Sequence, residues 1–458
     1  MHPLPRAIFK AYDIRGIVGD TLTPAIVHRI GQGLATLAQE SGRDTFAIGR
    51  DGRLSGPTLM TALADGLRAG GSNVIDLGMV ATPMTYFAAS VLGTGCSVMV
   101  TGSHNPPEYN GLKMVVDGTT LSGDDIQDLR QRCEDGRLAT GHGTLVAHDI
   151  APAYLDRIVG DVKVSRPMRI AVDCGNGVAG AFAPTLFTRM GCEVVPLYCD
   201  VDGNFPNHHP DPSKPENLAD LVARLREGDC ELGLAFDGDG DRLGVVTRDG
   251  HVIYPDRQLM LFAADVLSRN PGATIIYDVK STRNLSPWIR KHGGVPLLWK
   301  TGHSLIKGKM KETGAALAGE MSGHTFFGER WFGFDDGMYA GARLLEILSR
   351  HADPSAVLDT LPDALSTPEL NIPCGEGEAH ALIEQMATRE TFPGAVAIVR
   401  IDGLRVEYAD GFGLARASNT TPVIVLRFEA DDEAALARIQ DTFRQVLARA
   451  KPGMVVPF

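Results

Sequence analysis

The sequence predicts an α/β protein with three similar mixed α/β sheet domains plus a smaller C-terminal α+β domain, the four domains surrounding one central cleft. The chain has 458 residues, and at roughly 100–200 residues per domain this length corresponds to several domains. An order of strand, helix, strand, helix, strand occurs three times within residues 46–318, and the last segment has a different pattern. The expected domains are residues 1–149, 150–251, 252–363 and 364–458.

Each repeated unit contains three short apolar segments separated by helical stretches. The predicted strands are 46–49, 73–78 and 97–100 in the first unit, 169–173, 192–197 and 232–236 in the second, and 273–278, 294–298 and 315–318 in the third. Strands that alternate with helices indicate largely parallel pairing. Ligands bind at the carboxyl ends of such strands, so we expect the third strand of each unit to carry one functional loop into a shared site.

The C-terminal segment has the pattern of a small α+β domain. Strands 395–400 and 404–408 flank Asp402-Gly403, which is a hairpin signal. Further predicted elements are a polar loop at 413–422, a strand at 423–428 and an amphipathic helix at 432–450 with Asp431 or Asp432 as its N-cap. We expect the domain to swing about residues 365–368 and so open and close the cleft.

Charge and cysteine content indicate which classes of protein the chain can belong to. Lys plus Arg is 44 and Asp plus Glu is 56, which gives a net charge of −12 and argues against binding of nucleic acid. Seven cysteines without a C-x-x-C pair favour free thiols in a reducing compartment. Neither a signal peptide nor an apolar run long enough to span a membrane is expected. These observations predict a cytoplasmic protein that does not associate with membranes.

Ser103 lies in the run Thr101-Gly102-Ser103-His104-Asn105-Pro106, directly after the first unit's third strand. Its simplest interpretation is a turn serine that bonds its own backbone. The chain has no G-x-S-x-G motif around it, and His104 is not expected to act as its base because adjacent residues in an extended loop point apart. The functional alternative is a phosphoserine whose phosphate is bound by the loop. Nearby cations such as Lys113 and Arg15 would then be needed to balance the charge of the phosphate.

Asp237, Asp239 and Asp241 follow the second unit's third strand at alternate positions. An EF-hand is excluded because Arg242 and Arg248 stand where such a loop needs Gly and Glu. A solvated acidic turn is the plain alternative. Carboxylates at alternate positions of an extended segment share one face, so we predict that they bind one Mg²⁺.

Gly175-Asn176-Gly177-Val178-Ala179-Gly180 matches the dinucleotide fingerprint, with Asp200 further on. An NAD-dependent dehydrogenase that uses this loop is therefore an alternative from another class. The loop is also explained as a tight strand-to-helix turn that needs glycine, and the dehydrogenase hypothesis leaves Ser103 and the three aspartates without a role.

The third functional loop reads Gly319-Glu320-Met321-Ser322-Gly323-His324. Glu320 and Ser322 are suited to adjacent sugar hydroxyls, and His324 is either a plain core imidazole or a proton-transfer group. A fourth polar segment contains Arg416, Ser418, Asn419 and Thr420. It is either an ordinary hairpin tip or a binding loop for a dianionic phosphate.

These four motifs, in this order, resemble those of the α-D-phosphohexomutase family, and most closely its bacterial bifunctional phosphomannomutase/phosphoglucomutase branch. Matching segments also occur at 10–16, 110–113, 278–280 and 301–303, so the resemblance covers essentially the whole chain. It implies that five further residues belong to the site: Tyr12, Arg15, Lys113, Lys280 and His303. It also implies that Arg242 supports the acidic loop and approaches the phosphate.

The resemblance implies an isomerase that converts hexose 1-phosphate to hexose 6-phosphate, for mannose and glucose. Phosphorylated Ser103 would donate its phosphoryl group, glucose 1,6-bisphosphate would serve as activator and intermediate, and one Mg²⁺ would be bound by Ser103, Asp237, Asp239 and Asp241. His324 is the expected general base, with Lys113 and Arg15 as rival candidates. A monomer is expected, with a dimer as the alternative. Two further hypotheses for the function are a phosphoglucosamine mutase and a non-catalytic sugar-phosphate sensor.

Overall fold

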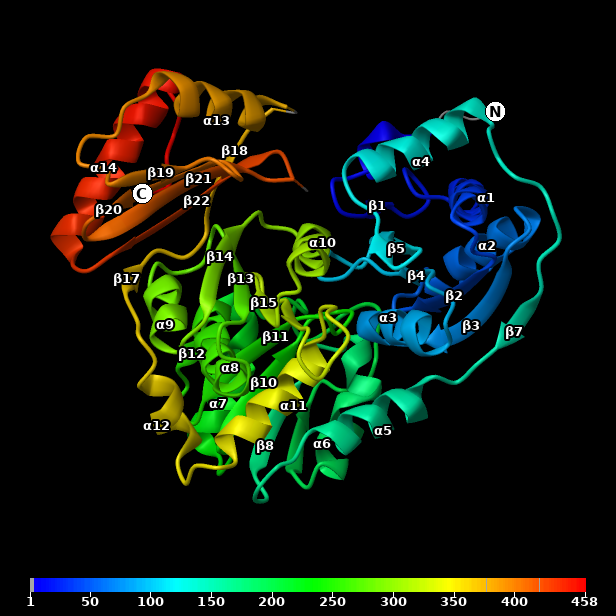
Figure 1. The fold of residues 1–458 in the computed structure, drawn as a ribbon, viewed down its shortest axis with the longest axis horizontal. Coiled ribbons are helices and arrows are strands. Elements are labelled where there is room, and N and C mark those ends of the chain that lie inside the picture. The colour runs from blue at the N-terminus through cyan, green and yellow to red at the C-terminus, as the bar shows by residue number, and fades with distance from the viewer. Residues whose placement is uncertain (1–3, 376, 420) are drawn as a thin grey trace.

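The computed structural model describes residues 4–375, 377–419 and 421–458, which form four β-sheets (Figure 1). The first sheet has the order β1-β5-β4-β2-β3-β7, with β6 paired to β5. Its strands are β1 (Ile14–Ile17), β2 (Thr45–Arg50), β3 (Asn73–Met79), β4 (Ser97–Val100), β5 (Tyr109–Val116), β6 (Thr119–Thr120) and β7 (Leu145–Ala147). Its helices are α1 (Pro24–Glu40), α2 (Gly56–Ala69), α3 (Thr82–Val91) and α4 (Asp124–Asp135).

The second and third sheets have the orders β12-β11-β10-β8-β9 and β14-β13-β15-β16. The second contains β8 (Arg169–Asp173), β9 (Glu193–Leu197), β10 (Leu232–Phe236), β11 (Leu243–Thr247) and β12 (Val252–Ile253), with α5 (Ala151–Asp161), α6 (Ala183–Arg189) and α7 (Ala219–Glu227). The third contains β13 (Thr274–Asp278), β14 (Val295–Trp299), β15 (Leu317–Gly319) and β16 (Thr325–Phe327). Around it are α8 (Pro255–Arg269), α9 (Leu285–Lys291), α10 (His303–Thr313), α11 (Gly337–Leu348) and α12 (Pro354–Asp359).

The three sheets share one topology. The first predicted strand of each unit (β2, β8 or β13) pairs in parallel with both other strands of its unit. The third strand (β4, β10 or β15) then pairs with an antiparallel strand that follows it in the chain. The loop between the third strand and its antiparallel neighbour is the predicted functional loop in every unit. The repeat predicted from the sequence is therefore confirmed, and the antiparallel strand is an addition to it.

The C-terminal sheet is antiparallel throughout. It contains β17 (Leu365–Ser366), β18 (Leu370–Pro373), β19 (Ala397–Val399), β20 (Leu404–Tyr408), β21 (Gly411–Ala417) and β22 (Val423–Ala430). Apolar residues of its strands pack on α13 (Glu378–Arg389) and α14 (Glu433–Ala450) in one core. The side chain of Asp432 accepts a hydrogen bond from the Ala435 N–H at 2.8 Å, so the predicted N-cap of α14 is Asp432.

Three sequence-based expectations are corrected. Residues 413–417 belong to β21 and not to a loop. The glycine loop 175–180 leads into a short 3-10 turn, Val178–Ala181, before α6 begins. Leu365 and Ser366 pair with β22 as strand β17, so the first half of the expected linker 365–368 is part of the C-terminal sheet.

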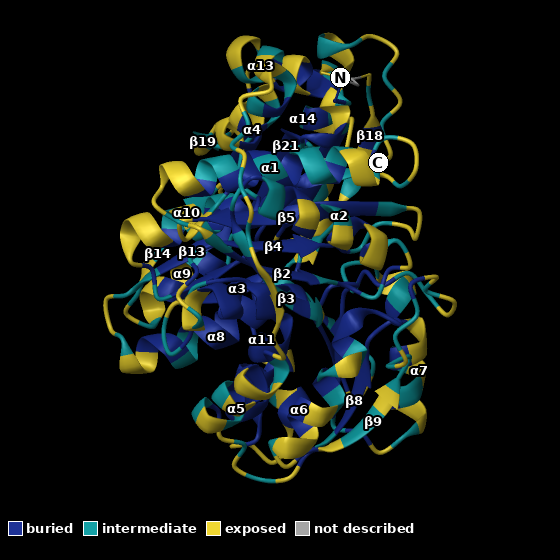
Figure 2. Ribbon diagram, turned by 90° about the vertical axis from the view of Figure 1, so that its right-hand side faces the viewer, coloured by how far each residue is buried: buried dark blue, intermediate teal, exposed yellow. Residues whose placement is uncertain are grey.

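The interior is dominated by buried residues of helices and strands, shown dark blue in Figure 2. Every residue of α11 is buried, because this helix lies between the second and third sheets. Most of its residues are apolar, and its buried Arg343 is paired with Asp265 and Glu329. Its N-cap, Asp336, accepts from the Tyr339 N–H at 2.9 Å and from the Tyr154 hydroxyl at 2.8 Å. This core fixes the second and third sheets relative to each other. Among the described helices, none has the length and apolar character of a membrane span.

Candidate active site

The loops that follow β4, β10 and β15 meet at one place. The Ser103 hydroxyl donates to Oδ2 of Asp237 at 3.2 Å. Nε of Arg242 donates to Nε2 of His324 at 3.1 Å, and the backbones of these two residues form a β-bridge. These contacts connect the carboxyl edges of the three similar sheets, as the strand order predicted.

Ser103 is held in a constrained backbone conformation. Its φ is 49°, in the left-handed region that non-glycine residues rarely adopt. Only 1% of the residue is exposed, and its N–H donates to Oγ1 of Thr101 at 2.7 Å. The surrounding loop therefore fixes the direction of the hydroxyl toward Asp237.

The expectation that Ser103 and His104 point apart is wrong. Nδ1 of His104 lies 3.1 Å from Oγ of Ser103, because the left-handed turn at Ser103 brings the two side chains to the same side. Burial, together with the nearby guanidinium groups of Arg242 and Arg15, lowers the pKa of the His104 imidazole well below its usual value. His104 is thus a neutral neighbour of the hydroxyl, and no feature of the local sequence signals this.

Asp237, Asp239 and Asp241 are completely buried, and one carboxylate oxygen from each lies within 4.8 Å of the others. Oδ1 of Asp237 accepts from the backbone N–H groups of Gly240, Asp241 and Arg242, each at 3.1 Å. The loop therefore closes on its own first carboxylate, and the three side chains share one face as predicted.

Lys113 neutralises part of this cage. Its Nζ lies 2.7 Å from Oδ2 of Asp239 and 2.5 Å from Oδ2 of Asp241. Burial by itself would raise the pKa of Asp239, but the Lys113 ammonium lowers it. Burial and repulsion from the other two carboxylates raise the pKa of Asp237 well above its usual value. The cage thus has a surplus of negative charge that one lysine does not remove.

The cage fits a divalent cation. Oδ1 of Asp239 and Oδ1 of Asp241 are buried without a hydrogen-bond partner among the described residues, although buried carboxylate oxygens are normally satisfied. Oxygen donors of this kind are the ligands that Mg²⁺ prefers.

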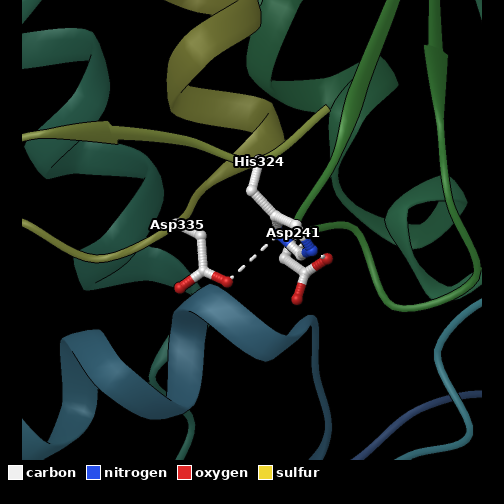
Figure 3. Close-up of side chains that lie close together, drawn as sticks. All are labelled: Asp241, His324 and Asp335. Atoms are coloured by element: carbon white, nitrogen blue, oxygen red, sulfur yellow. Dashed lines mark ion pairs between the residues drawn. The ribbon is translucent and has the colours of Figure 1, made fainter. Parts of the chain in front are cut away.

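A second cluster lies beside the cage (Figure 3). Nδ1 of His324 is 3.2 Å from Oδ2 of Asp335 and 3.5 Å from Oδ1 of Asp241. Nζ of Lys307 lies 2.9 Å from Oδ1 of Asp335, and despite burial this ammonium and the imidazoles hold the pKa of Asp335 well below its usual value. Since Nε2 of His324 accepts from Arg242, the ring proton is on Nδ1 and faces the carboxylates. Sequence reasoning missed Asp335, because nothing links it locally to the other motifs.

Residues of the third loop and its neighbours occupy the next part of the site. Glu320 is 2% exposed, and burial raises the pKa of its carboxyl group. Its Oε1 accepts a hydrogen bond from the backbone N–H of Gly302, directly before α10, at 2.5 Å. Ser322 is half-buried, and His303 is the buried first residue of α10. Nζ of Lys280 lies 3.0 Å from the Glu369 carboxylate.

The C-terminal sheet contributes predicted site residues from β21 and from the turn that follows it. Arg416 is 4% exposed and is paired with Asp402, with Nε 3.2 Å from Oδ2. Nδ2 of Asn419 donates to the hydroxyl of Tyr12, which donates to the carbonyl of Thr301 at 2.7 Å. Tyr12 therefore connects segments from the first, third and fourth sheets.

Arg15 lies against the serine loop, where its guanidinium donates to the side chains of Asn105 and Asp13. The backbone N–H of Ser418 donates to the Val423 carbonyl at 2.9 Å. Thr420 lies outside the described residues. The sequence-predicted residues around the cage are thus in direct contact, whereas Arg416 and Asn419 are placed beside Tyr12.

Four family models match consecutive parts of the chain. They are phosphoglucomutase/phosphomannomutase alpha/beta/alpha domain I at residues 6–139, domain II at 152–250, domain III at 254–365, and the C-terminal domain at 369–446.

The chain belongs to the phosphoglucomutase/phosphomannomutase family.

Similar members of this family match the whole chain. A phosphoglucomutase from Neisseria gonorrhoeae is 61% identical, with 100% of both chains covered. A phosphomannomutase/phosphoglucomutase from Pseudomonas aeruginosa is 57% identical, with 99% of this chain and 98% of the relative covered. A crystal structure of a family protein from Burkholderia thailandensis is 59% identical with a TM-score of 0.95, and covers 99% of this chain and 100% of the other. The predicted family, fold class and enzyme class, an isomerase of the mutase type, are thereby confirmed.

The glycine loop 175–180 has a packing role in this family member. A Cβ on Gly177 would lie 2.9 Å from Cα of Gly238 and 3.0 Å from the Asp237 carbonyl, and one on Gly180 would lie 2.1 Å from the Cys199 carbonyl. The glycines therefore let the loop lie directly behind the acidic loop. This close packing, with no α-helix starting at the loop, explains the fingerprint without a dinucleotide, and the dehydrogenase alternative is not favoured.

Proposed function

We propose that the protein converts hexose 1-phosphate to hexose 6-phosphate reversibly, for glucose and mannose, through a phosphoserine at Ser103 and a hexose 1,6-bisphosphate. The observation that carries this proposal is the hydrogen bond from Oγ of Ser103 to Asp237 in a buried three-carboxylate cage. The relatives named phosphoglucomutase and phosphomannomutase/phosphoglucomutase support both sugars. Phosphoglucosamine mutase activity, the alternative within the superfamily, is tested by comparing kcat/KM for the amino sugar with that for glucose 1-phosphate.

The proposed reaction consists of two phosphoryl transfers, after which the enzyme again carries a phosphoserine. In the first, the bond between Ser103 Oγ and phosphorus breaks, a bond from phosphorus to the free sugar hydroxyl forms, and the proton that this hydroxyl releases is passed to the leaving Oγ of Ser103. The bisphosphate then reorients, and its other phosphoryl group is transferred back to Ser103. In the second transfer this proton returns to the sugar oxygen that gives up its phosphoryl group. Because the phosphoryl transition state is loose, the residues act mainly by positioning and by charge stabilisation.

His324 is the residue best placed to hold the moving proton. Lys113 and Arg15 are cations paired with carboxylates, so neither has a free lone pair. Nε2 of His324 accepts a hydrogen bond from Arg242, and it becomes available when that guanidinium turns to a phosphate. Asp335 keeps the ring oriented through Nδ1, as carboxylates do for catalytic imidazoles.

Asp237, Asp239 and Asp241 are the residues that would hold Mg²⁺, together with a phosphate oxygen on Ser103. When bound there, Mg²⁺ supplies electrostatic stabilisation of the transferring phosphoryl group. Arg242 lies 3.7 Å from the Asp237 carboxylate and adds a positive charge on the same side.

The sugar and the phosphate that does not react are expected to bind at the loops of the third and fourth domains. Glu320 and Ser322 bind two sugar hydroxyls that occupy near-symmetric positions when the bisphosphate reorients, with Lys280 and His303 beside them. Arg416, Ser418, Asn419 and Thr420, with Tyr12, bind the phosphate that does not react. We further propose a monomer, located in the cytoplasm, and glucose 1,6-bisphosphate as activator.

Replacing Glu320 by alanine is expected to weaken sugar binding and to leave Ser103 phosphorylated. A hydrogen bond to a charged group contributes about 1.5–3 kcal/mol, so KM for glucose 1-phosphate should rise roughly 10-fold or more. Steady-state kinetics and intact-mass analysis measure the two effects. Glu312→Ala, on the exposed side of α10, is the matched control, and loss of the phosphoserine with an unchanged KM contradicts the assignment.

Replacing Arg416 by alanine is expected to raise KM for the sugar phosphate by more than one decade, because a charge-assisted contact of about 1.5–3 kcal/mol is lost. Arg438→Ala is the control, since Arg438 forms an exposed ion pair with Asp410 in the same domain. If KM stays at the wild-type value, Arg416 is only the structural partner of Asp402.

A further inference from the structure

Arg53 is the most deeply buried cation next to the serine loop. It follows β2, and none of its side chain is exposed. A buried guanidinium is unfavourable unless all of its donors are paired. No local motif singles Arg53 out, because the four carbonyl groups to which it donates lie more than forty residues further along the chain, at the loop around Ser103.

The donors of Arg53 are directed at one loop. Nη2 donates to the carbonyls of Ser103 at 2.8 Å and of Asn105 at 2.6 Å. Nη1 donates to the carbonyls of Pro106 at 2.6 Å and of Tyr109 at 3.0 Å. A planar, rigid guanidinium thus holds four carbonyl groups of residues 103–109 in fixed relative positions.

Asp51 couples this guanidinium to the other end of the Ser103 peptide. Its Oδ2 lies 3.2 Å from Nε of Arg53 and accepts from the Thr101 hydroxyl at 2.7 Å. Oγ1 of Thr101 in turn accepts from the Ser103 N–H at 2.7 Å. The backbone N–H and C=O of Ser103 are therefore both anchored to one buried ion pair, which keeps the residue in its left-handed conformation.

The surroundings leave little room for another arrangement. A Cβ on Gly102 would lie 2.6 Å from Cζ and Nε of Arg53, and a Cβ on Gly238 of the acidic loop would lie 2.3 Å from the Ser103 carbonyl. The ring of Phe205, from the second domain, covers the guanidinium with its centroid 5.1 Å from Cζ. The serine loop is thus enclosed between Arg53 and the acidic loop.

We infer that Arg53 is a positioning residue for phosphoryl transfer: it fixes the peptide of Ser103 so that Oγ faces the carboxylate cage, and it does so without contacting the sugar. This inference rests on the proposed function. Misplacement of a reacting group by about 1 Å costs roughly 100-fold in rate, while the sugar and the distal phosphate are bound by loops of the third and fourth domains.

The experiment compares Arg53→Ala with Arg343→Ala. Arg343 is also fully buried and is paired with Asp265 and Glu329, away from the serine loop. Both variants are expected to lower Tm. Only Arg53→Ala should lower kcat by roughly 100-fold, with KM within about twofold of wild type. Added guanidinium ion should restore part of the kcat of Arg53→Ala. The phosphorylation of Ser103 by glucose 1,6-bisphosphate, followed by intact mass, should slow in parallel.

Thr101→Val provides a milder variant if Arg53→Ala does not fold, because it removes the hydroxyl between Asp51 and the Ser103 N–H and leaves the ion pair intact. It should also lower kcat with KM unchanged. A kcat for Arg53→Ala equal to that of Arg343→Ala, or a wild-type kcat for Thr101→Val, overturns the inference. Failure of the wild-type protein to form phosphoserine at residue 103 overturns the proposed function instead, so the two failures are distinct.

Discussion

Replacing Ser103 by alanine is expected to reduce mutase turnover by roughly 10⁴-fold or more, as is typical when a covalent carrier is removed. The side chain is buried, and its hydroxyl donates to Asp237 and lies 3.1 Å from Nδ1 of His104. The substitution therefore removes one oxygen and its two polar contacts and leaves the loop backbone in place. A coupled assay of glucose 1-phosphate conversion measures the loss.

Ser41→Ala is the matched control, because the Ser41 hydroxyl donates to the Leu37 carbonyl at an exposed position. It should retain wild-type turnover and the mass of one phosphoryl group. Turnover of Ser103→Ala close to that of wild type would remove the serine from the reaction.

Removal of divalent cations is expected to lower turnover by at least roughly 100-fold without unfolding the protein. In the described part of the chain, the cage of three aspartates has oxygens on Asp239 and Asp241 that lack a hydrogen-bond partner, and phosphoryl transfer beside it requires charge neutralisation. The ammonium of Lys113 stays between the same two side chains, so the metal-free fold retains one internal cation.

Dialysis against a chelator, followed by activity assays and thermal melting, measures both effects, and added Mg²⁺ should restore turnover. Asp220→Asn, an exposed carboxylate on α7 that contacts Tyr198, should behave like wild type, whereas Asp239→Asn should not recover at the same Mg²⁺ concentration. Full turnover in protein shown by elemental analysis to be free of metal contradicts the role of the cage.

Much of the architecture could be predicted because apolar strands and glycine-rich turns are local signals. The parallel core of each repeated unit and the hairpin of β19 and β20 are predicted in this way. The antiparallel strand after each functional loop is not, since its pairing depends on a partner already in the sheet. Residues 413–417 resemble a loop because they contain glycine and alanine and run into the polar segment 418–421. However, Gly411 and Gly413 pack against α14, where a Cβ would lie 2.7 Å from Ile439 and 2.4 Å from Phe443.

The same distinction holds for the site. Ser103 and the three aspartates could be found because each directly follows an apolar strand. The orientation of His104 could not, because the left-handed φ of Ser103 depends on a network that joins Thr101 to Asp51 and Arg53, which lie outside the hexapeptide. Asp335 and Arg53 were missed because they act through contacts between segments far apart in the chain. The proposed reacting and metal-binding residues lie in a local sequence pattern. The residues that orient them do not.

Transfer of label from the enzyme to the sugar tests the central claim most directly. Protein carrying a radioactive phosphoryl group on Ser103 is mixed with unlabelled glucose 1-phosphate for a single turnover, and the protein and sugar fractions are then separated. The label should leave Ser103 for the sugar at a rate at least equal to kcat. Label that remains on the serine while glucose 6-phosphate accumulates would contradict a phosphoserine carrier.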